Sequence, residues 1–296
     1  MMNTSLDLSG KIEPLTVSVL IHIQQIALKE GISIFIVGAT ARDILLEVAH
    51  GISPKRATVD IDIAAFFENW FQFDRVKETL VQSADFKPGR ETQRLIFKNR
   101  LPVDLVPFGG IADTDDYIEW PPDRNFRICV AGFEECYRHS IPIQLSINPD
   151  LVIQVVSLAG LAILKLISWN DSAERRSKDA HDLCFIIQNY LDAGNLDRLF
   201  KEAQDLVEAE DYDYELASAR LLGRDMSKIA TVSTKKTLME ILERESLRNQ
   251  GHRIAMDVLQ GDGFRWFEYE RVVAFFEFLL NGLTEAIGPY GERLRR

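Results

Sequence analysis

The sequence predicts an α+β fold: a mixed sheet with helices over residues 1–156, followed by an all-helical bundle over residues 157–296. Short apolar runs of strand length, flanked by Gly, Pro, Asn and Asp, occur before residue 156. From residue 158 onward, apolar residues recur at helical spacing instead. With 296 residues and 46% hydrophobic content, the chain can bury two cores of this kind.

The first part alternates helical and strand-like segments. Apolar residues at helical spacing predict a helix over 13–30, which ends at Gly31 because glycine commonly stops a helix. Two runs separated by Asn99 and Arg100 form a predicted hairpin. The predicted strands are 32–37, 58–64, 94–98, 102–106 and 151–155, and the other predicted helices are 41–49 and 69–81.

The second part is predicted to be helical throughout. Its first helix, 157–169, is apolar apart from Lys165, and five more helical patterns follow at 178–190, 196–207, 214–229, 235–247 and 267–283.

Residues 107–127 separate two predicted strands and are rich in Gly, Asp and Pro, which predicts a long loop. Tyr117 and Trp120 in this loop have two interpretations. They offer a surface for base stacking or acceptor binding, or they are aromatic residues tucked under a surface loop.

Two aspartates, Asp60 and Asp62, lie one residue apart in a strand-like run. Because side chains alternate between the faces of a strand, both carboxylates should share one face, while Val59, Ile61 and Ile63 point into the core. Magnesium prefers carboxylate and phosphate oxygens, and two such ions about 4 Å apart can hold the attacking and leaving oxygens of phosphoryl transfer. Asp104, on the second strand of the predicted hairpin, is the candidate third carboxylate.

An Asp-x-Asp pair alone is more often a solvated strand end or turn than a metal site. Three acids on apolar strands, following the Gly-containing turn at Gly38, favour a metal site instead.

At this point the chain resembles the polymerase-β-like nucleotidyltransferases, and most closely the AbiEii/AbiGii toxin family among them. The segment 38–46, GATARDILL, matches the entry motif of that family, with Ala39 where Gly or Ser is usual. The resemblance implies that Gly38, Ala39, Thr40 and Arg42 bind a nucleoside triphosphate. It also implies that Asp60, Asp62 and Asp104 bind two Mg²⁺ ions, with Mn²⁺ as an alternative.

The helical part also resembles the family, and the resemblance implies that residues 1–156 are the catalytic domain and that residues 157–296 close its active site. Residues 175–183, RRSKDAHDL, resemble the basic-Asp-x-x-Asp motif of the family. By this resemblance Lys165 holds phosphates, and Asp179 or Asp182, neighbours on one helix face, orients the acceptor or acts as general base. The alternatives are that Lys165 extends its ammonium to the surface and that the basic run is a solvated helix start. Replacement of Lys165 by Met is expected to leave the stability of the ligand-free protein unchanged or raised.

The function implied is transfer of a nucleoside monophosphate to an acceptor hydroxyl, with a tRNA 3′ end as acceptor and a cognate antitoxin protein as partner. Transfer to a small molecule or a protein side chain, and a catalytically silent binding module, are the alternatives. A net charge of −11 argues against broad nucleic-acid affinity. Local patches at Lys55-Arg56 and Arg175-Arg176 could still dock one RNA end.

Three features predict a cytoplasmic location. The three cysteines have no metal-ligand spacing and are expected to be reduced. The segment 1–11 is polar and unlike a signal peptide. The longest apolar run is interrupted by Lys165, so no stretch approaches the roughly 18 apolar residues of a membrane span.

Overall fold

The computed structural model describes residues 6–54, 59–121, 126–173, 176–208, 212–246, 252–260 and 268–285. The chain divides into two compact units, Met1–Ser157 and Leu158–Arg296. The predicted boundary after residue 156 lies one residue before this division, and the roles assigned to the two parts stay predictions. Each unit is described by itself below.

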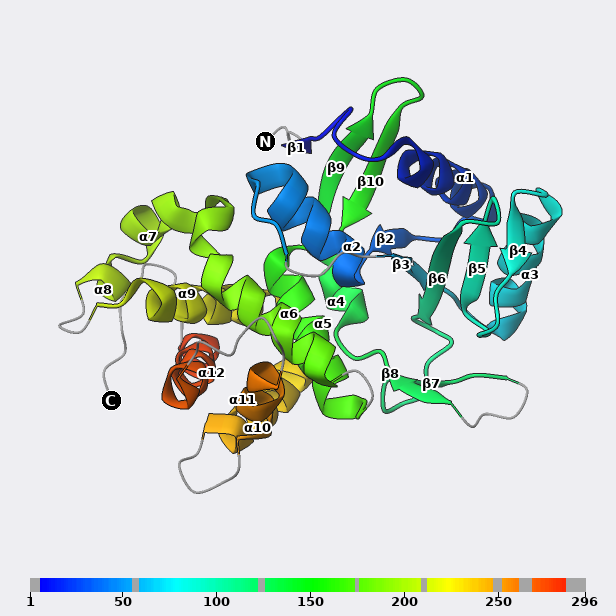
Figure 1. Ribbon diagram of the computed structural model, residues 1–296. Helices are drawn as coiled ribbons and strands as arrows, with labels where there is room; N and C mark the ends of the chain where they lie inside the picture. Colours follow the sequence, from blue (N-terminus) through cyan, green and yellow to red (C-terminus); the bar gives the residue numbers. More distant parts are fainter. Residues whose placement is uncertain are drawn as a thin grey trace. The chain divides into compact units, whose positions relative to one another are not determined.

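The first unit is built on an eight-stranded mixed sheet (Figure 1). Its strand order is β1-β9-β10-β2-β3-β6-β5-β4. The central pair, β3 and β6, is parallel, whereas β2–β3 and β5–β6 are antiparallel. The strands are β1 (Leu6–Asp7), β2 (Ile34–Ile36), β3 (Ile61–Phe66), β4 (Phe86–Pro88), β5 (Arg94–Phe97), β6 (Leu101–Phe108), β9 (Ile141–Ser146) and β10 (Leu151–Val155).

The helices of this unit begin and end where local chemistry favours it. Pro14 occupies the first turn of α1, and Gly31, at φ 67°, ends it. The Asn69 side chain accepts a hydrogen bond from the Gln72 backbone N–H and caps α3. A two-stranded sheet of β7 (Tyr117–Glu119) and β8 (Arg127–Cys129) completes the unit. The helices are α1 (Pro14–Glu30), α2 (Gly38–Arg42), the π-helix η1 (Asp43–Val48), α3 (Trp70–Gln82) and α4 (Phe133–Arg138).

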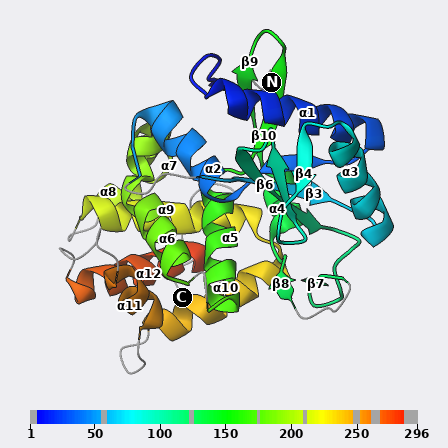
Figure 2. The ribbon, with the colours of Figure 1, turned by 45° about the vertical axis from the view of Figure 1, so that its right-hand side comes forward.

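The two faces of the sheet are covered differently. On one face, His22 of α1 contacts the rings of Phe86 and Phe97, and α1 packs beside α3 (Figures 1 and 2). On the other face, Phe35 and Phe108 contact each other, and each packs against Phe133 and Tyr137 of α4. Because Phe108 and Asp104 are four residues apart in β6, this second face also carries Asp104.

The second unit is helical throughout its described residues, as predicted. Gly223 of α9 and Gly282 of α12 lie at a close helix crossing: a Cβ at Gly223 would be 2.2 Å from the Leu279 carbonyl oxygen, and one at Gly282 would be 2.0 Å from that of Arg220. Arg220 and Arg224, beside this contact, both bind Glu285. The helices are α5 (Leu158–Asp171), α6 (Arg176–Asn189), η2 (Leu191–Asn195), α7 (Leu196–Glu202), α8 (Gln204–Val207), α9 (Tyr214–Ile229), α10 (Val232–Ser246), α11 (Arg253–Leu259) and α12 (Tyr269–Thr284).

The structure confirms the predicted fold class and corrects two details. Residues 107–127 are not one structureless loop, because β6 extends to Phe108 and β7 lies within the segment. Val59 does not point into the core: it precedes β3 and is 75% exposed, whereas Ile61 and Ile63 are buried as predicted. None of the described helices has the length and apolar character needed to cross a bilayer.

Candidate active site

The parallel register of β3 and β6 places Asp62 directly beside Asp104. Paired residues of neighbouring strands project to the same face, so these two carboxylates stand together on the face that packs on α4. Ile61 and Ile63, and Val103 and Leu105, project to the opposite face and are buried. The alternation that buries these residues therefore fixes the direction of the acids.

Asp60 lies one residue before β3 rather than within it. The Thr40 hydroxyl donates a 3.1 Å hydrogen bond to the Asp60 carbonyl oxygen, which ties the start of the strand to α2. Thr40 is buried. Its hydroxyl therefore positions Asp60. This role was not predicted from the sequence, where Thr40 was considered only as a phosphate-binding residue.

Gly38 opens α2 with a left-handed φ of 63°. A Cβ at this position would lie 2.1 Å from Asp62 Oδ2, closer than any real contact. Both the backbone conformation and the close approach of a carboxylate therefore require glycine here. The Gly38 backbone therefore lies directly against the Asp62 carboxylate.

The third acid is held by an arginine that the sequence analysis did not single out. Arg94 of β5 pairs with Asp104 across the hairpin. Its Nε lies 2.7 Å from Asp104 Oδ1 and its Nη2 lies 2.6 Å from Oδ2, a bidentate ion pair. The same Nη2 lies 3.1 Å from Asp60 Oδ2. The hydrogen bonds to Asp104 are the main cause that raises the pKa of Arg94 above its ordinary value, so this side chain stays cationic.

The side chains at this face fit a magnesium site in their donor chemistry. Asp60, Asp62 and Asp104 supply carboxylate oxygens, the ligands that hard divalent ions prefer. Gly38 lets the start of α2 approach one of these carboxylates closely. Among the described residues, however, no three His, Cys, Asp or Glu side chains are gathered closely enough to hold an ion without adjustment. Arg94, between Asp60 and Asp104, is the group that an ion would have to displace.

The other residues of the predicted nucleotide motif are buried. Ala39 and Thr40 are 8% exposed and Arg42 is 2% exposed. The Arg42 guanidinium donates to Asp43 Oδ1 from Nε at 2.8 Å and from Nη2 at 2.6 Å. The structure thus places Arg42 in a local ion pair, and its contact with a nucleotide stays a prediction.

In the second unit, α5 and α6 bring Lys165, Asp179 and Asp182 together. The Lys165 ammonium lies 2.7 Å from Asp179 Oδ1 and 2.7 Å from Asp182 Oδ2, and the Ser168 hydroxyl donates to Asp179 Oδ2 at 2.7 Å. The Lys165 side chain is only 12% exposed, so it does not extend to the surface. Burial alone would lower the pKa of Lys165, but the charges of Asp179 and Asp182 outweigh it and raise that pKa.

The predicted site residues therefore form two clusters, one in each unit. Asp179 and Asp182 share a helix face, as their spacing predicted. Which of them orients an acceptor, and whether Lys165 binds phosphate, stay predictions. The basic patches Lys55-Arg56 and Arg175 lie outside the described residues, as does the side chain of Arg176.

The aromatic residues considered for base stacking are engaged within the unit. Trp120 is 3% exposed, and its ring packs against Trp70 and Phe73. Tyr117 lies under the Arg127 guanidinium, 3.7 Å from it. The interpretation as tucked aromatics is therefore correct for Trp120.

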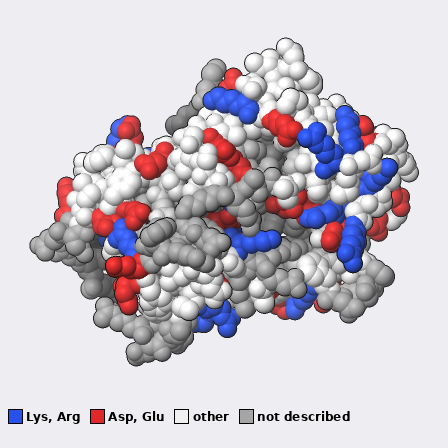
Figure 3. Space-filling view, in the orientation of Figure 1, with Lys and Arg blue, Asp and Glu red and all other residues white. Residues whose placement is uncertain are grey.

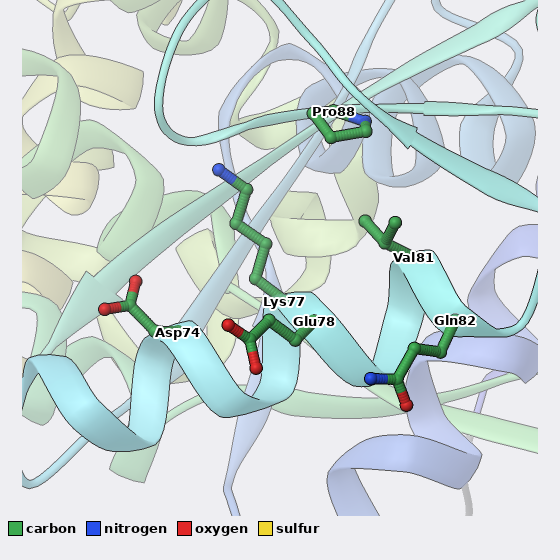
Figure 4. Close-up of a pocket in the computed structure, with 6 residues that line it drawn as sticks. All are labelled: Asp74, Lys77, Glu78, Val81, Gln82 and Pro88. Carbon is green, nitrogen blue, oxygen red and sulfur yellow. The ribbon is translucent and has the colours of Figure 1, made fainter.

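The first unit also has a pocket and a basic surface that contain none of the predicted site residues. A shallow pocket of about 390 Å³ lies between α3 and β4, where Lys77 extends between Asp74 and Pro88 (Figure 4). On the face shown in Figure 3, basic side chains gather over α3, β4 and β5, with acidic side chains between them. The exposed basic residues between the start of β4 and the start of β6 are Lys87, Arg90, Lys98 and Arg100.

Solved structures with detectable similarity are distant. The antibiotic-resistance factor ANT(2'')-Ia has 13% identity and a TM-score of 0.34, covering 67% of this chain and 97% of that one. A nucleotidyltransferase-like antigenic protein from Paracoccidioides brasiliensis has 15% identity and a TM-score of 0.37, covering 67% and 93%. The Thermotoga maritima CCA-adding enzyme, complexed with tRNA, has 12% identity and a TM-score of 0.26, covering 93% and 82%.

No curated protein matches the chain. The profile of one protein family, described as "Nucleotidyl transferase AbiEii toxin, Type IV TA system", matches residues 28–249. This match spans more than half of the chain and includes both clusters of predicted site residues. The chain is therefore an enzyme that belongs to the AbiEii family of nucleotidyltransferase toxins.

Proposed function

We propose that this enzyme uses Mg²⁺ to transfer a nucleoside monophosphate from a nucleoside triphosphate to an acceptor hydroxyl, with the tRNA 3′ end as acceptor. The observation that carries the proposal is the β3–β6 register, which sets Asp62 beside Asp104 and behind Gly38. In the reaction, the acceptor oxygen forms a bond to the α-phosphorus, the bond from that phosphorus to the β-phosphate oxygen breaks, and pyrophosphate leaves. The hydroxyl proton passes to a general base, for which Asp179 or Asp182 is the candidate.

The carboxylates of the sheet have separate roles in this proposal. Asp60 and Asp62 would hold the ion that binds the triphosphate, and Asp104 would complete a second ion site, with Mn²⁺ as an alternative metal. The bound ions supply charge neutralisation at the reacting phosphate. Gly38, Ala39 and Thr40 would lie against the phosphates, Arg42 beside them, and Thr40 also keeps Asp60 in place.

Lys165, Asp179 and Asp182 would act on the nucleotide and the acceptor. The Lys165 ammonium donates a hydrogen bond to Asp179 Oδ1 at 2.7 Å and lies 2.7 Å from Asp182 Oδ2. With three N–H groups, it can also donate to a phosphate. Asp179 and Asp182 would orient Lys165, and one of them would orient the acceptor or act as general base.

The RNA acceptor is the finer part of the proposal. The exposed basic side chains between the start of β4 and the start of β6, on both sides of Arg94 in the sequence, support a polyanionic acceptor despite the net charge of −11. A small molecule or a protein side chain is the alternative acceptor, which that net charge favours. A cognate antitoxin protein is the proposed partner, and a cytoplasmic location is consistent with Cys129, Cys136 and Cys184, which form no disulfide among the described residues.

The test is nucleotide transfer by the purified protein. Each labelled nucleoside triphosphate is incubated with Mg²⁺ and total RNA, a small-molecule extract or protein, and the labelled fraction identifies the acceptor. Asp60→Asn and Asp62→Asn should each lower transfer by at least about 100-fold while the fold survives, because amides cannot supply the charge that an ion needs. Asp74→Asn, on the exposed face of α3, is the matched control and should keep normal activity. Near-normal transfer by Asp60→Asn or Asp62→Asn at saturating Mg²⁺ would refute the metal assignment.

A further inference from the structure

Arg94 is fixed by the hairpin that carries it. The Gly89 backbone N–H donates to the Arg94 carbonyl oxygen at 2.8 Å, and β5 pairs Arg94 with Asp104. A Cβ at Gly89 would lie 2.6 Å from Arg94 Cγ, so the missing side chain at position 89 is the space through which the Arg94 side chain passes. The stem is therefore directed toward the acids by its surroundings on both sides.

The guanidinium stands where two carboxylates from different segments converge. Arg94 Nη2 lies 2.6 Å from Asp104 Oδ2 and 3.1 Å from Asp60 Oδ2. A divalent ion that binds both oxygens needs the same position, and a guanidinium nitrogen in contact with that ion would meet strong like-charge repulsion. Arg94 and the ion therefore compete for Asp60 and Asp104.

We propose that Arg94 is an internal counter-cation of the carboxylate site: it holds Asp60 and Asp104 together in the ligand-free enzyme and must release Asp60 before a divalent ion binds. This inference rests on the metal site of the proposed function. It adds a residue that sets how tightly the enzyme binds its ion.

The structure also offers the released guanidinium another partner. Glu91 Oε2 lies 3.7 Å from Arg94 Nε, and the Glu91 side chain is 48% exposed. A small movement of the arginine toward Glu91 would exchange one carboxylate for another and leave the Asp60 oxygen free. Nε carries one hydrogen, which Asp104 Oδ1 accepts, so a bond from Nε to Glu91 would replace that bond and release Asp104 Oδ1 as well.

The experiment measures Mn²⁺ binding to the nucleotide-free protein by calorimetry and by electron paramagnetic resonance, so it does not depend on activity. Arg94→Gln should lower the Kd for Mn²⁺ by about tenfold, or ~1.4 kcal/mol. Arg75→Gln removes an arginine that binds Glu30 at 2.7 Å in the same unit, and this control should leave the Kd unchanged. Circular dichroism checks that each variant is folded.

Two further variants keep the test decisive. Arg94→Lys preserves the charge but not the planar fork, and should lower the Kd by about threefold even where the glutamine variant is unstable. Glu91→Gln should raise the Kd in the wild-type background and have no effect in Arg94→Gln, because its role depends on the arginine.

The possible failures are distinguishable. Folded Arg94→Gln and Arg94→Lys proteins that bind Mn²⁺ no more tightly than wild type would overturn the counter-cation role and leave the metal site intact. Absence of saturable Mn²⁺ binding in wild type and in all variants would overturn both this inference and the metal site of the proposed function.

Discussion

Each unit of the chain holds one cation against two aspartates, but the two clusters differ in exposure. Arg94, which holds Asp104 and Asp60, is 29% exposed at a sheet face that also carries Asp62. Lys165, which holds Asp179 and Asp182, is 12% exposed, and its partners are 7% and 6% exposed. The first cluster has water and ions within reach, whereas the second is enclosed between α5 and α6.

One cation held by two aspartates can therefore have different consequences: an exposed cluster can exchange its cation, whereas a buried cluster holds its side chains in fixed positions. A partly exposed ion pair contributes little to stability, because water replaces a lost partner. A buried carboxylate that loses its lysine is left without compensation, which is costly. The sheet cluster is therefore suited to exchange one cation for another, and the helical cluster to fix the positions of its members.

The largest expected effect is on the stability of the helical cluster. Lys165→Met should lower the free energy of unfolding by about 3–5 kcal/mol, because Asp179 and Asp182 would remain buried without their cation. This reverses the expectation from sequence alone, which treated Lys165 as an unpaired cation in an apolar helix. Urea unfolding followed by circular dichroism measures the change.

Lys201→Met is the matched control, since Lys201 binds Asp197 at 2.9 Å with its side chain 71% exposed. It should change stability by less than about 1 kcal/mol. Equal, small losses in the two lysine variants would show that burial does not distinguish the clusters. A smaller nucleotide-induced rise in melting temperature in Lys165→Met would separately support its phosphate role.

In the sheet cluster, replacement of Asp104 should reduce nucleotide transfer more than it reduces triphosphate binding. Asp104→Ala should keep triphosphate affinity within about tenfold, ~1.4 kcal/mol, and still fail in transfer, because Asp60 and Asp62 remain to bind the ion on the triphosphate. Calorimetric titration with a non-hydrolysable triphosphate and single-turnover transfer measure the two quantities. Loss of triphosphate binding with unimpaired transfer would contradict the role of Asp104 in the transfer step.

A glycine beside the sheet cluster gives an effect of intermediate size. Gly38→Ala combines a φ of 63° with a Cβ 2.1 Å from Asp62 Oδ2, and should cost about 1–3 kcal/mol of stability and also displace Asp62. Gly51→Ala is the control, because Gly51 has a φ of 73° and nothing within 4 Å of the added atom. Thermal unfolding of both variants separates backbone strain from the clash. Equal losses of stability in the two variants would mean that the Asp62 side chain moves away from the added methyl group without a free-energy penalty.

The fold class, and the strand positions of Asp62 and Asp104, could be predicted from sequence because their signals are local. Apolar alternation identified the strands that carry Asp62 and Asp104, and helical periodicity gave α9 its bounds, Tyr214–Ile229. Val59 was misassigned because it continues the apolar alternation of Ile61 and Ile63, although it lies before the first paired residue of β3. The strand β9 was missed although Ile141, Ile143 and Leu145 alternate, since Pro142 interrupts its strand-like composition.

Arg94 escaped prediction because its position depends on register. A two-residue turn at Asn99 and Arg100 would set Arg94 opposite Leu105, on the wrong face. The structure pairs Phe97 with Leu101, with Lys98 and Asn99 at positive φ, and this shift of one residue brings Arg94 opposite Asp104. The approach of α12 to Gly223 is likewise a property of the packed helices that periodicity does not encode.

The smallest expected effect concerns pH, in a buried carboxylate of the helical unit that has several donors. Asp225 accepts hydrogen bonds from Arg198, Lys228 and the Tyr190 hydroxyl. Burial would raise the pKa of Asp225, but these bonds, that of Arg198 foremost, lower it below its ordinary value of 3.8. On acidification, Asp225 therefore becomes protonated in the unfolded chain at a higher pH than in the folded protein. The stability that its lowered pKa contributes is present above the ordinary pKa of an aspartate and is lost as the pH falls through the pKa of Asp225 in the folded protein.

Asp225→Asn should therefore flatten the acid limb of stability below about pH 4, by no more than ~1.4 kcal/mol per pH unit for one carboxyl. Urea unfolding of wild type and variant between pH 6 and pH 3 measures the two slopes, and the comparison concerns slopes because the substitution also changes stability at neutral pH. Asp197→Asn, at an 82% exposed side chain, is the control and should follow wild type. If Asp225→Asn lost stability on acidification as steeply as wild type, the carboxylates of the helical unit would titrate like exposed ones, and the contrast between the two units would have to rest on the Lys165 cluster alone.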